Sequence, residues 1–122
     1  GNLTTDSYEK LIHIAFLYKK SKADKQGKAN IYLRITVDAR RVEISVNRKI
    51  SIERWNSNAN RAKGHSEEAL KINQYLDIIQ NKIYKIHQSF IENDKPFSAE
   101  LIRKHYLGEK VFVSRSVLFH KP

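Results

Sequence analysis

The sequence has no cysteine, no methionine, only four isolated glycines and no long apolar run. Without cysteine there is no disulfide and no thiolate metal site, which suits a reducing compartment. No stretch approaches the roughly 18 consecutive apolar residues of a membrane span. The scattered glycines exclude a glycine-rich phosphate-binding loop. Because the chain also lacks an initiator methionine and a signal peptide, we expect a cytoplasmic piece of a larger protein.

Side chains suited to catalysis or metal binding are equally scattered. The five histidines never recur at a spacing of three or four residues, so no helix offers a pair of metal ligands. Asp6, Asp24, Asp38 and Asp94 fall in predicted turns or near a terminus, and nothing assembles a general acid–base pair. We therefore expect no catalytic residue, no metal and no cofactor.

Positive charge is concentrated in the first half of the chain. Residues 1–64 hold 14 Lys or Arg against 6 Asp or Glu, a net of +8 within a formal total of +10. Residues 65–122 hold 9 against 7, a net of only +2. Such a field attracts phosphate groups and favours a polyanion or an anionic membrane surface as partner.

Residues 28–46 alternate strictly between apolar and polar side chains, which predicts strands over 29–37 and 41–46 with a turn at 38–40. The second of these strands is expected to extend through Lys49. Residues 10–19 predict an earlier strand, with apolar groups on both faces, and a lysine-rich loop follows it. Connections this short favour a three-stranded antiparallel sheet. One face of the two later strands is apolar (Ile31, Leu33, Ile35, Val37, Val42, Ile44, Val46).

Residues 56–64 are predicted to form a polar loop, where we place a domain boundary. After this loop the apolar residues recur with the period of an α-helix. Apolar residues separated by 4, 3, 4, 3 and 4 positions predict a helix from about 66 to 92, capped by Ser66 and ended before Pro96. Ser98 is expected to cap a second helix over 98–107. The tail over 109–122 has strand-like alternation without a visible partner. The apolar stripe consists of Ile72, Leu76, Ile79, Ile83, Ile86 and Phe90.

These elements predict an α+β fold, in which a small three-stranded antiparallel sheet packs against a long helix that a short helix follows. The stripe on the long helix has two interpretations. It covers the apolar face of the sheet within the chain, or it mediates self-association as a coiled coil. Packing within the chain is the more common use of such a stripe.

The polar face of the strands, on a very basic half of the chain, favours double-stranded DNA as the partner. A β-ribbon fits the major groove, where arginine pairs with guanine and hydroxyl groups suit phosphates or base edges. The alternative is an ordinary solvated sheet face. An RNA-binding sheet is disfavoured, because Tyr32 is the only aromatic residue clearly on that face. The predicted contact residues are Tyr32, Arg34, Thr36, Arg40, Arg41, Glu43 and Ser45 in the strands and turn, Lys19, Lys20, Lys22, Lys25 and Lys28 in the loop, and Arg48 and Lys49 beyond.

Several segments together resemble a known family. They are GKANIYLRITV (27–37), RRVEISV (40–46), Trp55, EALKINQYL (68–76) and FSAELIRKHYLG (97–108). In order and spacing this set resembles the N-terminal region of tyrosine recombinases of the phage-integrase family, of the kind carried by mobile elements. The resemblance covers about residues 10–108.

The resemblance implies an arm-type DNA-binding module over 1–64, whose sheet enters the major groove of accessory DNA sites. Residues 65–108 then pack on the sheet or lead toward a core-binding domain, and 109–122 departs from the pattern. Other recombinase protomers are implied as further partners. No histidine is followed three residues later by arginine, so the family's catalytic motif is missing. We therefore expect this chain to be no enzyme, although its parent would be a site-specific recombinase.

Overall fold

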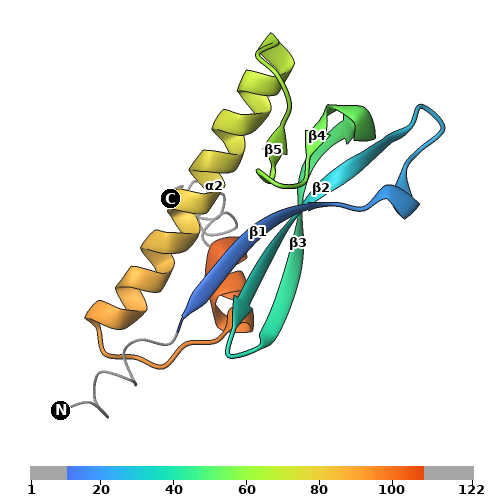
Figure 1. Ribbon diagram of the computed structural model, residues 1–122. Helices are drawn as coiled ribbons and strands as arrows, with labels where there is room; N and C mark the ends of the chain where they lie inside the picture. The colour runs from blue at the N-terminus through green and yellow to red at the C-terminus, as the bar shows by residue number, and fades with distance from the viewer. Residues whose placement is uncertain (1–10, 109–122) are drawn as a thin grey trace, which may run out of the picture.

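The computed structural model describes residues 11–108 and has the predicted α+β architecture (Figure 1). Strands β1 (Ile12–Tyr18), β2 (Lys28–Val37) and β3 (Arg40–Ser51) form one antiparallel sheet in the order β1-β2-β3. The remaining elements are the 3-10 turns η1 (Lys20–Lys22) and η2 (Ile52–Arg54), the two-stranded ribbon of β4 (Trp55–Asn56) and β5 (Arg61–Ala62), the long helix α2 (Glu67–Glu92) and a short helix over 99–108. The predicted tail over 109–122 lies outside the described residues.

The register of β2 and β3 confirms the predicted alternation. Polar residues face polar residues across the two strands, because both strands keep the period of two. The strand β3 is longer than predicted, since a bulge lets pairing resume at Asn30–Lys49 and Ala29–Ile50. Asn47 lies within the bulge with a φ of 60°. The polar pairs are Tyr32–Ser45, Arg34–Glu43 and Thr36–Arg41.

The turn between β2 and β3 is one residue shorter than the predicted turn over 38–40. It consists of Asp38 and Ala39 alone, because Arg40 already belongs to β3 and pairs with Val37. Both turn residues have positive φ, 54° and 65°, as a type I′ hairpin turn requires. Asparagine, aspartate and glycine tolerate this conformation, whereas the Cβ of alanine is crowded in it.

Replacing Ala39 with glycine is therefore expected to raise the free energy of unfolding by about 1 kcal/mol. Urea unfolding followed by circular dichroism would measure the change. The matched control is Ala23→Gly, at a position with a φ of −67°, where the added backbone freedom should give no gain. Equal changes in both variants would contradict the assigned turn.

The helix α2 lies along the apolar face of the sheet (Figure 1). All six residues of its predicted stripe are buried, with exposed fractions between 0 and 7%. They share one core with Phe16, Ile31, Leu33 and other residues of the sheet. The interpretation that the stripe packs within the chain is thus confirmed. The same side chains are then unavailable for a coiled coil unless the chain unfolds.

The ends of α2 and of the short helix follow the predicted capping. The Ser66 hydroxyl accepts a hydrogen bond from the backbone N of Ala69 at 3.2 Å. The Ser98 hydroxyl likewise accepts one from the backbone N of Leu101 at 3.0 Å. Between the helices, Phe97 packs edge-on against His87 with 4.9 Å between ring centroids, and burial lowers the pKa of His87.

The segment 56–64, expected to be a loop, contains β5 and is attached to α2. The Asn73 side chain on α2 accepts a hydrogen bond from the backbone N of Ala62 at 2.8 Å and donates one to its carbonyl oxygen at 3.1 Å. An amide side chain thereby pairs with the ribbon as a neighbouring strand would. Trp55 and Ala62 join the core shared by the sheet and α2, so this core runs across the predicted boundary.

Candidate nucleic-acid interface

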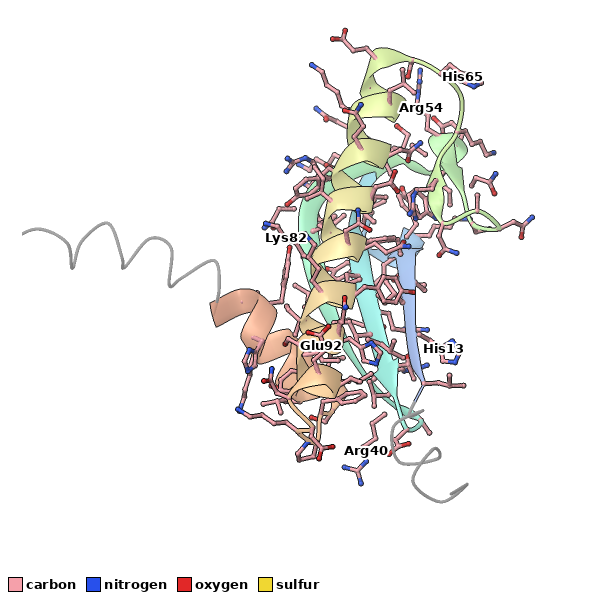
Figure 2. All side chains as sticks on the ribbon, turned by 90° about the vertical axis from the view of Figure 1, so that its left-hand side faces the viewer. His13, Arg40, Arg54, His65, Lys82 and Glu92 are labelled. Atoms are coloured by element: carbon pink, nitrogen blue, oxygen red, sulfur yellow. The ribbon has the colours of Figure 1, made fainter. Side chains whose placement is uncertain are left out.

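The two faces of the sheet differ sharply in burial. Every buried residue of β1, β2 and β3 lies on the side of α2, which Figure 2 places in front of the strands. On the opposite side, called the open face below, the side chains are half-buried or exposed. Pairing of β1 with β2 adds His13, Ala15 and Leu17 to this side. The open face thus comprises His13, Ala15, Leu17 and Lys19 with Lys28, Asn30, Tyr32, Arg34, Thr36, Arg41, Glu43, Ser45 and Lys49.

An ion-pair network occupies the middle of the open face. The Arg34 guanidinium donates to Oε2 of Glu43 through Nε at 3.0 Å and through Nη2 at 2.7 Å. Lys19 Nζ donates to the other carboxylate oxygen, Oε1. The hydrogen bonds from Lys19 and then from Arg34 lower the pKa of Glu43. Glu43 therefore stays ionised at neutral pH and holds two cations in fixed positions.

The lysine-rich loop over 19–28, called the lysine loop below, contacts the same face through Tyr32. Lys19 Nζ lies 4.3 Å from the centroid of the Tyr32 ring, and Lys22 Nζ lies 5.8 Å from it. These distances are within the range of cation–π attraction. The loop thereby extends the positive surface beyond the end of β2.

Asp24 organises the loop itself. Its Oδ1 accepts hydrogen bonds from the backbone N of Gln26 at 2.9 Å and of Lys28 at 3.0 Å. Its Oδ2 accepts one from Lys49 Nζ at 3.2 Å. The backbone hydrogen bond from Lys28 is the largest cause of the lowered pKa of Asp24. Lys49 is thus partly neutralised, and the loop has a defined shape.

Comparison with protein families gives one match, to the Arm DNA-binding domain over residues 16–103. The chain belongs to this family. The match confirms the resemblance to the arm-type region of tyrosine recombinases, and it identifies a DNA-binding domain. Comparisons with curated proteins and with solved structures find no significant match.

The predicted contact residues of this Arm DNA-binding domain fall into three groups. Those on the open face are Lys19, Lys28, Tyr32, Arg34, Thr36, Arg41, Glu43, Ser45 and Lys49. The loop residues Lys20, Lys22 and Lys25 are exposed and, within residues 11–108, form no ion pair with a carboxylate. Arg40 and Arg48 form the third group, away from the open face.

The arginines of this third group lie on the α2 side of the sheet. Arg40 pairs with Val37, whose side chain is buried in the core. Figure 2 shows Arg40 at the turn between β2 and β3. Arg48 stacks on Tyr75 of α2, with 4.0 Å between the guanidinium carbon and the ring centroid. The sequence pattern did not reveal this separation, because it depends on the register and on the position of α2.

Two polar residues of the open face were absent from the prediction. His13 lies opposite Thr36, and Asn30 lies opposite Lys49. The first strand carries apolar groups on both faces, so its orientation could not be assigned before its register was known. Within residues 11–108, no three metal-binding side chains lie together, and no helix is long and apolar enough to cross a membrane.

Proposed function

We propose that the open face binds double-stranded DNA as the accessory-site module of a site-specific tyrosine recombinase. In this proposal residues 1–64 supply the contacts, while residues 65–108 brace the sheet and lead toward a core-binding domain. The chain itself has no catalytic role, and other protomers of the full-length recombinase are further partners.

The observation that supports this proposal best is that, within residues 11–108, no element covers the open face and several cations along it lack a carboxylate partner. Arg41 lies on the face opposite Thr36 and, among the described residues, has no carboxylate partner. Lys20, Lys22 and Lys25 lie at the other end of the strands. Cations spread along the face can contact both DNA backbones while the strands occupy the major groove.

An NMR titration with duplex DNA tests the location of the contact. We expect the amide resonances of β2, β3 and the loop over 19–28 to shift, and those in the middle of α2 to stay in place. A competing single-stranded RNA should displace the duplex only weakly, because stacking partners on this face are few. Shifts confined to α2 would contradict the proposal.

Replacing Arg41 with alanine should weaken binding and alter sequence preference, since it removes an exposed donor from the open face. One base contact is worth about 1–3 kcal/mol of discrimination. The matched control is Lys82→Ala, which removes one charge from α2 on the other side of the sheet (Figure 2). Fluorescence anisotropy with labelled duplexes measures both variants. Equal effects of the two changes would indicate a long-range charge effect instead of a contact.

A further inference from the structure

A single carboxylate lies within the basic open face. Glu43 is the only acidic residue in strands β1, β2 and β3. It is also half-buried, with 24% of its side chain exposed. An ionised carboxylate against a DNA phosphate would be repelled. If the open face binds DNA, the surroundings of Glu43 must therefore face something other than the backbone.

The base edges offer suitable partners at this position. In the major groove, the amino group of cytosine is a donor that a glutamate accepts, and guanine presents the acceptors N7 and O6. A carboxylate acceptor next to a guanidinium donor on the protein is therefore suited to the major-groove edges of cytosine and guanine. Glu43 and Arg34 are such a pair, directly opposite each other on β3 and β2.

The hydrogen bonds of Arg34 define which of its donors remain. The edge formed by Nε and Nη2 is bound to Glu43 Oε2. Among the described residues no acceptor binds Nη1, so the end of the guanidinium keeps Nη1 and the second hydrogen of Nη2 as two parallel donors. Two parallel donors match N7 and O6 of one guanine.

The carboxylate of Glu43 is itself held in place. Lys19, which directly follows β1, binds the second carboxylate oxygen of Glu43, and the same ammonium group contacts the Tyr32 ring. Both oxygens are thus engaged, and rotation of the carboxylate would break contacts on either side. The Arg34 guanidinium, which is bound to this carboxylate, therefore loses less rotational freedom on binding a base than an arginine without such a partner.

From this geometry we infer that Glu43 is a positioning residue, which directs the free end of Arg34 at a guanine in the major groove. This inference rests on the proposed function of the open face. It places the centre of the face, around Arg34 and Glu43, on base edges and the exposed loop lysines Lys20, Lys22 and Lys25 on phosphates.

The test compares the wild-type chain with Glu43→Gln, using selection from a library of random-sequence DNA duplexes. The selected duplex and a scrambled duplex are then titrated over a range of salt concentrations. We expect Glu43→Gln to lower the ratio of the two affinities by about fivefold or more, because the amide holds the guanidinium weakly. Affinity for the scrambled duplex should rise, and the salt dependence should steepen by about one unit as Lys19 and Arg34 become available to phosphates.

Two further variants separate positioning from a change in charge or folding. Glu92→Gln removes the same charge from the last residue of α2 and should leave the ratio unchanged. Arg34→Lys keeps the positive charge without the two parallel donors, so it should lower the ratio as Glu43→Gln does. Urea unfolding confirms that each variant is folded at the temperature of the titration.

The possible failures are distinct. A wild-type chain that selects no sequence, or that binds no duplex, overturns the proposed function and the inference with it. A wild-type chain that selects a sequence, together with a Glu43→Gln variant whose ratio stays within twofold, overturns the role of Glu43 alone.

Discussion

Replacing Leu76 with alanine is expected to lower the free energy of unfolding by about 2–5 kcal/mol. Leu76 is 0% exposed at the middle of the buried stripe of α2. Its removal costs the transfer of the lost methyl and methylene groups and leaves a cavity between α2 and the sheet. Because a domain of this size is stable by only about 5–15 kcal/mol, this loss is a large part of the total.

The same helix provides the matched control. Leu70 is 49% exposed, so Leu70→Ala makes the same chemical change without opening a cavity and should alter stability by less than about 0.5 kcal/mol. Urea unfolding at two protein concentrations measures both variants. Similar losses in the two variants, or a concentration-dependent midpoint for the wild-type chain, would contradict packing of the stripe within one chain.

Replacing Lys20, Lys22 and Lys25 together with alanine is expected to weaken DNA binding on the order of 100-fold at 0.1 M salt. Each phosphate contact contributes about 0.9 to the slope of log affinity against log salt, so three contacts flatten the slope by nearly three units. The loss should be about the same for every duplex, since lysine at a phosphate carries no sequence information.

The control for the lysine loop is the triple variant of Lys71, Lys82 and Lys85, which removes the same charge from exposed positions of α2. These residues are outside the open face, and we expect their loss to cost only a small part of the affinity. Anisotropy titrations from 50 to 300 mM salt compare the two triple variants. If both flatten the slope equally, the loop makes no direct phosphate contacts.

Much of the open face was predictable because strand periodicity is a local property. The alternation alone placed Arg34, Thr36, Arg41 and Glu43 on one side of the strands. Their pairing, Arg34 with Glu43 and Thr36 with Arg41, also required the two-residue turn, whereas the predicted turn over 38–40 is one residue longer. The membership in the Arm DNA-binding domain family also agrees with the resemblance seen in the sequence. The role of each residue within the face could not be predicted, because the contacts between side chains also depend on β1 and on the lysine loop.

Lys19 and Arg48 illustrate this difference. Lys19 belongs to the predicted lysine loop, yet the structure brings it to the carboxylate of Glu43, 24 residues away in sequence. Arg48 follows the polar strand closely, yet it stacks on Tyr75 of α2. Neither contact has a signature in the sequence, since each joins segments that meet only after the sheet and α2 have packed.

The sequence alone determined the three strands of the main sheet, the two helices, the apolar stripe of α2 and the polar side of β2 and β3. These properties follow from periods of two and of 3.6 residues, which each segment expresses without its neighbours. Only the tertiary structure decided the orientation of β1, the bulge near Asn47, and the hydrogen bonds that join Nε and Nη2 of Arg34 to Glu43. Those features depend on register and on contacts between distant segments, which burial of the common core fixes.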